Sequence, residues 1–82
     1  MNKITIYSTP TCVYCRMAKK FFDSKKIEYA DINVAMDHKA AEEMIQKSGQ
    51  MGVPVIMIEK NGHENIIIGF DMPQISRLLE IS

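Results

Sequence analysis

The two cysteines of the chain, Cys12 and Cys15, are separated only by Val13 and Tyr14, and they stand where a strand-like segment changes to a helical pattern. Small secreted domains use several dispersed cysteines as disulfide staples. An isolated pair at this spacing in a reducing compartment is instead typical of a catalytic dithiol or of a metal site. The fold therefore has to hold two thiols at a strand-to-helix turn.

The length and charge of the chain limit the kind of protein that can carry this cysteine pair. The 82 residues suffice for a single domain, residues 1–82, with a small core, and 46% apolar and 24% charged residues are ordinary for a globular protein. Ten basic and ten acidic side chains cancel, so neither nucleic acid nor a membrane is expected as a partner. Neither a signal-peptide pattern nor an apolar stretch of ~20 residues is present. We therefore expect a cytoplasmic protein that acts as a monomer.

Hydrophobic periodicity predicts alternating strands and helices. The predicted strands are residues 4–7, 27–33, 53–58 and 66–68. The predicted helices begin at Val13, after Asp37 (ending near Gly49) and after Asp71. Asn61-Gly62 predicts a hairpin between the last two strands. The order is β-α-β-α-β-β-α, in which a parallel β-α-β unit is extended by an antiparallel hairpin.

Methionines are frequent in the chain, which contains seven. Met17 lies on the same predicted helical stripe as Phe21 and Phe22, Met44 lies on the second helix, and Met57 lies within an apolar strand. Core packing explains such positions better than a metal or redox role. We therefore predict that these methionines are buried.

Cys12 is expected at the start of the first helix, with Thr11 or Cys12 as the capping residue. Unpaired N–H groups and the positive end of the helix dipole stabilise a thiolate there, and Arg16 and Lys19 add positive potential. Cys15 lies one turn further in and should be more sheltered. Cys12 would attack a substrate disulfide, and Cys15 would then attack the Cys12 sulfur, release the reduced substrate and leave an internal disulfide.

Two alternatives to a redox pair follow from the same residues. Structural zinc sites need four ligands, and the only further candidates, His38 and His63, lack the H-x₃₋₅-H spacing. Two inert buried cysteines are the other alternative, which their place at a strand-to-helix turn disfavours. The sequence therefore predicts no metal ligands.

Several residues are candidates for substrate contact. If the Val53–Pro54 bond is cis, the Val53 N–H and C=O face the region near Cys12 and can pair with an extended substrate. Gly69, Phe70 and Asp71 precede the last helix, where Asp71 is a simple N-cap or where backbone N–H groups hold a substrate carboxylate. Tyr14 is expected to be partly exposed and either contacts substrate or covers the disulfide.

Three motifs together resemble the glutaredoxin family over essentially the whole chain: Y-S-T-P-T-C-V-Y-C at residues 7–15, G-V-P-V-I at residues 52–56 and G-F-D at residues 69–71. The resemblance implies an α/β thioredoxin-like fold with a four-stranded mixed sheet flanked by three helices. It also implies Cys12 as nucleophile, Cys15 as resolving thiol and Pro54 as a cis-proline.

The chain departs from the family pattern at positions that concern glutathione. Members usually carry proline between the cysteines and a lysine or arginine three residues before the first, where this chain has Val13 and Thr9. The usual G-G-x-D-D-like segment lacks one glycine and its second aspartate, which is Met72 here. Val13 and the Gly69-Phe70 pair are also similar to the NrdH-type redoxins, which take electrons from thioredoxin reductase. Small glutaredoxin-like proteins of the YruB type are similar too.

These observations predict a dithiol oxidoreductase that reduces disulfide-containing proteins or glutathione mixed disulfides. No bound cofactor is expected, and glutathione or a thioredoxin-reductase-type enzyme would supply electrons. One alternative is an NrdH-like dedicated electron donor, for example to ribonucleotide reductase. The other is a metal- or cluster-binding module that uses the same cysteines.

Overall fold

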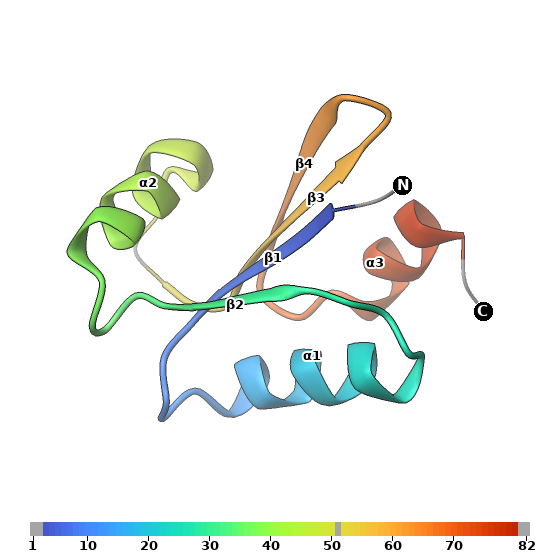
Figure 1. Cartoon of the computed structure of the whole chain (residues 1–82), viewed down its shortest axis with the longest axis horizontal. Helices are drawn as coiled ribbons and strands as arrows, with labels where there is room; N and C mark the ends of the chain where they lie inside the picture. The colour runs from blue at the N-terminus through green and yellow to red at the C-terminus, as the bar shows by residue number, and fades with distance from the viewer. Residues whose placement is uncertain (1–2, 51, 81–82) are drawn as a thin grey trace.

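A computed structural model describes residues 3–50 and 52–80 of the chain (Figure 1). The four strands are β1 (Lys3–Ser8), β2 (Ala30–Asn33), β3 (Val55–Lys60) and β4 (His63–Ile68). The three helices are α1 (Val13–Ser24), α2 (His38–Ser48) and α3 (Met72–Leu79). The predicted order β-α-β-α-β-β-α is confirmed. Within the described ranges, no helix is both long and apolar enough to cross a membrane.

The strands form one mixed sheet in the order β2-β1-β3-β4. β1 pairs with β2 in parallel and with β3 in antiparallel orientation, and β3 and β4 form the predicted hairpin. Asn61 and Gly62 make its turn with φ angles of 53° and 80°, the left-handed conformation that a tight hairpin turn requires. The thioredoxin-like fold implied by the sequence is therefore confirmed.

The helices cover both faces of this sheet, with α1 and α3 on one face and α2 on the other (Figure 1). The larger core cluster lies under α1 and α3; its buried residues are Ile4, Ile6, Ala18, Phe22, Ile56, Ile58, Ile67 and Ile75. The smaller cluster lies under α2; its buried residues are Tyr7, Ala40, Met44 and Val55. Alternate residues of β1 and β3 serve opposite clusters because side chains alternate across a strand.

The second and third strands begin later than the sequence predicted. The parallel pairing of β2 with β1 starts only at Ala30, and the backbone N–H of Ile27 instead donates to the Phe22 carbonyl at 2.9 Å, which closes the end of α1. β3 begins at Val55 because Pro54 has no N–H for the ladder. The predictions of strands over 27–33 and 53–58 are thus wrong in their first residues.

The prediction that Met17 is buried is wrong. Its side chain is 46% exposed, whereas Met44 and Met57 are buried as predicted. The buried residues of α1 are Cys15, Ala18 and Phe22. Met17 and Ala18 belong to neighbouring stripes that both fit a helical period, and the sheet selects the stripe that includes the small alanine.

We predict that Phe22 is a major contributor to stability. Its side chain is 0% exposed, and its ring lies 5.7 Å from the rings of both Phe21 and Tyr29, measured between centroids. Phe22→Ala should lower the free energy of unfolding by about 3–5 kcal/mol, measured by urea denaturation. Met36→Ala, at a side chain that is 84% exposed, is the control and should change it by less than about 0.5 kcal/mol. Equal effects of the two changes would contradict the described core.

Candidate active site

Cys12 occupies the N-cap of α1, as predicted, with φ −84° and ψ 116°. Its Sγ accepts a hydrogen bond of 3.1 Å from the backbone N–H of Cys15. That N–H is one of the first-turn donors that an α-helix leaves without an internal partner. Cys12 is partly exposed, so its sulfur is held by the helix terminus in a residue that solvent reaches.

Cys15 has the opposite environment. Its side chain is 0% exposed, and both cysteines are free thiols in this structure. Burial, the largest cause, and the hydrogen bond with the Cys12 side chain raise the pKa of Cys15 to about 12, while the Thr9 backbone and the Lys19 charge oppose the rise. The pair therefore consists of one accessible sulfur and one sheltered, protonated thiol.

An ionic cluster anchors α1 to the sheet close to this pair. The Lys19 ammonium donates to the Asp31 carboxylate at 2.8 Å, and the Ser8 hydroxyl donates to the other oxygen of the same carboxylate at 2.7 Å. Burial raises the pKa of Asp31, but the hydrogen bonds from Lys19 and Ser8 outweigh it and lower that pKa overall. Lys19 is thus engaged by Asp31, and the Arg16 guanidinium donates to the Pro10 carbonyl at 3.3 Å.

Sequence reasoning missed Ser8 and Asp31 as parts of this region. The two residues are 23 positions apart and meet only because β1 and β2 pair in parallel, in the register that aligns Ser8 with Asn33. Their only signal in the sequence is a pair of polar side chains within otherwise apolar strand segments. Such a signal does not identify a partner.

The segment before β3 lies beside the cysteine turn. Tyr7, the penultimate residue of β1, pairs with Val55, the first residue of β3, so the ends of both strands meet at one edge of the sheet. The Val53–Pro54 bond is cis, as the resemblance implied. Pro54 is buried and Val53 is half-buried. The topology thus brings Val53 and Pro54 to the edge that carries Cys12.

The segment that follows β4 reaches the same edge. Ile68, the last residue of β4, pairs with Val55, and the backbone N–H of Gly69 donates to the Pro54 carbonyl at 2.8 Å. The Asp71 carboxylate accepts a 3.2 Å hydrogen bond from the Gln74 N–H, which confirms the N-cap interpretation. Phe70 turns toward α1, where its ring lies 5.8 Å from that of Phe21.

The remaining candidates lie on the outside of the turn or away from it. Tyr14 is 63% exposed, in agreement with the prediction of a partly exposed ring, and Val13 is exposed to the same degree. The two histidines start separate elements, His38 in α2 and His63 in β4. Among residues 3–50 and 52–80, no three histidine, cysteine or acidic side chains are grouped so that they could hold a metal ion.

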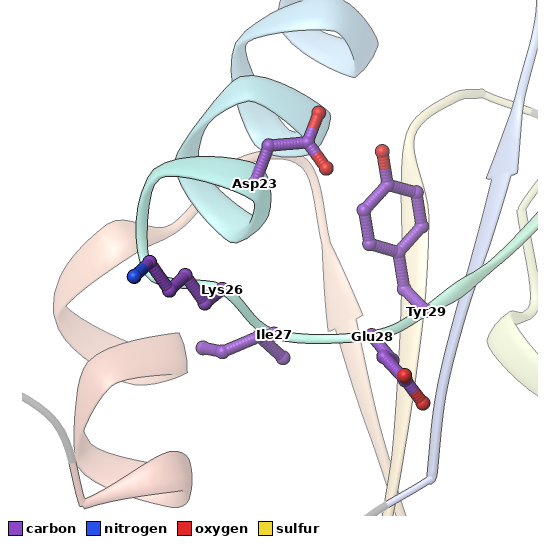
Figure 2. Close-up of a pocket in the computed structure, with 5 residues that line it drawn as sticks. All are labelled: Asp23, Lys26, Ile27, Glu28 and Tyr29. Carbon is purple, nitrogen blue, oxygen red and sulfur yellow. The ribbon is translucent and has the colours of Figure 1, made fainter.

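A hollow lies at the end of α1 that is opposite the cysteines (Figure 2). It is lined by Asp23, Lys26, Ile27, Glu28 and Tyr29. Figure 2 shows the Asp23 carboxylate directed toward the Tyr29 hydroxyl. Burial, followed by the charge and hydrogen bond of Asp23, raises the pKa of Tyr29. This hollow has no thiol among its lining residues and is separated from the thiol pair by the length of the helix.

The arrangement at the cysteine end supports thiol–disulfide exchange. Exchange needs an attacking thiolate that a disulfide can reach, and a second thiol close enough to displace the product. Cys12 and Cys15 meet these needs because one sulfur is accessible and the other lies one helical turn inside. Three segments that are distant in the sequence lie at this end of the sheet: the cysteine turn, residues 52–54 and residues 69–71.

Comparisons with known proteins agree with this geometry. The sequence model of the glutaredoxin family matches residues 4–63. A glutaredoxin-like 8.6 kDa protein of the rubredoxin operon of Clostridium pasteurianum is 49% identical over 94% of this chain and 97% of its own length. Glutaredoxin 3 of Escherichia coli is 36% identical over 72% of this chain and 71% of its own length.

The fold comparison gives the same assignment. The structure of the glutaredoxin-like protein NrdH-redoxin from Escherichia coli superimposes with a TM-score of 0.76 at 29% identity, covering 93% of each chain. The match of the family model, the identity to the clostridial and Escherichia coli relatives and the paired thiols at the start of α1 lead to one conclusion. The chain belongs to the glutaredoxin family of thiol–disulfide oxidoreductases.

Proposed function

We propose that this protein is a dithiol reductant of disulfide-containing proteins, with Cys12 as nucleophile and Cys15 as resolving thiol. The observation that carries the proposal is the hydrogen bond of 3.1 Å from the Cys15 N–H to the Cys12 sulfur, made across a pair in which only Cys12 is accessible. The same N–H group favours Cys12 as a thiolate, since it donates to the atom that bears the charge.

The reaction proceeds in two exchanges. The Cys12 thiolate attacks one sulfur of the substrate disulfide, forms a mixed disulfide and releases the other substrate sulfur as a thiolate. Cys15 then loses its proton and attacks the Cys12 sulfur, which forms the Cys12–Cys15 disulfide and releases the second substrate sulfur. The two released sulfurs take up protons. The substrate gains two electrons, and the protein needs a two-electron donor to return to its dithiol form.

The substrate backbone is held by the segment next to the nucleophile. Val53 is half-buried at the sheet edge that carries Cys12, ahead of the first ladder residue of β3. Its backbone groups can extend the pairing pattern of the sheet to a substrate strand and align its disulfide for attack. Tyr14, Gly69, Phe70 and Asp71 complete the contact region, and no bound cofactor takes part.

Glutathione is a poor donor in this proposal. Thr9 and Met72 provide no charge where related proteins hold glutathione carboxylates. Two of the nearby cations are engaged elsewhere, Lys19 by Asp31 and Arg16 by the Pro10 carbonyl. The similarity to NrdH-redoxin over 93% of the chain favours a second candidate, a dedicated electron donor reduced by a thioredoxin-reductase-type enzyme. Recycling assays with each donor and NADPH separate the two.

The two thiols should differ strongly in reactivity. In Cys15→Ser, Cys12 should react quickly with iodoacetamide at neutral pH. In Cys12→Ser, Cys15 should react at least about 100-fold more slowly, because it remains buried and burial is the largest cause of its raised pKa. Its rate should rise about tenfold per pH unit below that pKa, since the thiolate fraction does. Both thiols should react alike in urea, and similar native rates would contradict the assigned roles.

Removal of the resolving thiol should trap the substrate. Cys15→Ser should accumulate a covalent complex of Cys12 with a protein substrate, since the second exchange lacks its internal thiol. Mass spectrometry after rapid acid quenching measures the complex, and dithiothreitol should release it. Cys12→Ser is the control and should trap nothing. A complex formed through Cys15 in that control would reverse the roles of the two cysteines.

A positive charge at position 9 should improve the use of glutathione. Thr9→Lys supplies the cation that Thr9 lacks, and a partly exposed carboxylate contact of ~1 kcal/mol should lower the KM for glutathione about fivefold. Deglutathionylation rates against glutathione concentration measure this. Gln46→Lys adds the same charge on the exposed face of α2 and is the control. Saturation of the native protein at low glutathione, unchanged in Thr9→Lys, would show that the donor site lies elsewhere.

A further inference from the structure

An apolar groove lies between α1 and the segment that enters α3. Its volume is about 380 Å³. The lining residues are Met17, Lys20, Phe21, Ser24, Phe70 and Met72. Most of its wall is therefore made by two methionines and two phenylalanines, with Lys20 as its one charged residue.

The methionines of this groove leave much of their surface in solvent. Met17 is 46% and Met72 is 47% exposed, while the rings of Phe21 and Phe70 are half-buried and lie 5.8 Å apart between centroids. Contiguous exposed apolar surface on a small protein marks an interaction site, and flexible methionines adapt to varied apolar partners.

Both walls of the groove are linked along the chain to the proposed active site. Val13, Met17 and Phe21 follow one another at intervals of four residues, so they form one stripe along α1. Val13 is 63% exposed and lies between the two cysteines. On the other side, Phe70 follows Gly69, whose N–H bonds to the carbonyl of Pro54. The groove therefore lies within reach of a chain bound at Cys12.

The groove carries one positive charge, that of Lys20, which is free to pair with an acidic group of a partner. Lys20 makes no hydrogen bond or ion pair with any other described residue, in contrast to its neighbour Lys19, which is engaged by Asp31. A carboxylate beside the bound apolar side chain would give Lys20 a partner. The groove therefore fits an apolar side chain followed by an acidic residue.

We propose that this groove binds an aliphatic or aromatic side chain of a protein substrate, a few residues from the attacked cysteine and next to an acidic residue that faces Lys20. This inference rests on the proposed function. Met17 is five residues beyond Cys12, about 7.5 Å along the helix axis, a distance that two or three residues of extended chain span. Glutathione carries no apolar side chain, so the groove favours polypeptides over glutathione.

The test uses two synthetic peptides of nine residues and the pre-reduced protein as the sole reductant. Each peptide has a central cysteine as its mixed disulfide with β-mercaptoethanol and glutamate at both ends. One has leucine three residues to each side of the cysteine, and the other has glutamine there. The protein dithiol becomes a disulfide while the probe gains two electrons and becomes two thiols. Acid-quenched chromatography gives the second-order rate constants, with bis(2-hydroxyethyl) disulfide as a small probe.

The native protein should reduce the leucine peptide about tenfold faster than the glutamine peptide. Met17→Gln should lower this ratio to about two, because glutamine keeps the length and helix propensity of methionine but not its apolar surface. Met17→Leu should keep the ratio. Met36→Gln, at an exposed methionine outside the groove, is the matched control and should keep it too. Lys20→Gln should lower the rate constant for reduction of the leucine peptide about twofold.

Equal rates for the two native reactions, or a ratio that survives Met17→Gln, would overturn the groove assignment. The groove assignment would also be overturned if Met17→Gln lowered the rate constants for both peptides and for bis(2-hydroxyethyl) disulfide by the same factor. The Met17 side chain would then support the thiol pair and not the recognition of substrate. Absence of reaction between the native protein and bis(2-hydroxyethyl) disulfide would instead contradict the proposed function. The two hypotheses therefore fail by different results.

Discussion

The hydrogen bond from the Cys15 N–H to the Cys12 sulfur is the contact on which the functional end of the molecule depends. It exists because β1 ends at Ser8 and α1 begins at Val13, so that one short turn places a sulfur atom at the first N–H groups of the helix. A helix terminus needs an acceptor there, and the thiol supplies it. One sulfur atom therefore caps the helix and accepts a hydrogen bond from its first turn.

Burial of α1 against the sheet makes the two thiols unequal. Ala18 and Phe22 are fully buried in the larger core cluster, and Cys15 lies on the same stripe of the helix, so packing draws its sulfur inside. The neighbouring stripe, which includes Met17, is left facing solvent beside Phe70. The packing that stabilises the fold therefore also shelters the Cys15 thiol and leaves an apolar groove on the exposed side of α1.

The local elements of this protein could be predicted from its sequence. Helix starts at Cys12, Asp37 and Asp71 follow from capping chemistry, and the hairpin follows from Asn61-Gly62, since each depends on backbone groups within a few residues. The two cysteines were identified for the same reason, because their spacing and their place at a turn are local properties. The parallel and antiparallel parts of the sheet followed from the order of the elements.

Only the tertiary structure decided which surfaces meet. Met17 and Ala18 fit a helical period equally well, and the sheet buried the stripe of the smaller side chain. Asp31 contacts Ser8 and Lys19 in the folded protein. Ser8 and Asp31 are 23 positions apart, and only the pairing of β1 with β2 brings them together, which no local pattern encodes. The sequence by itself thus determined the thiol pair, its capped turn and the order of elements. Long-range packing decided which thiol is sheltered, because burial depends on what the rest of the chain places over each side chain.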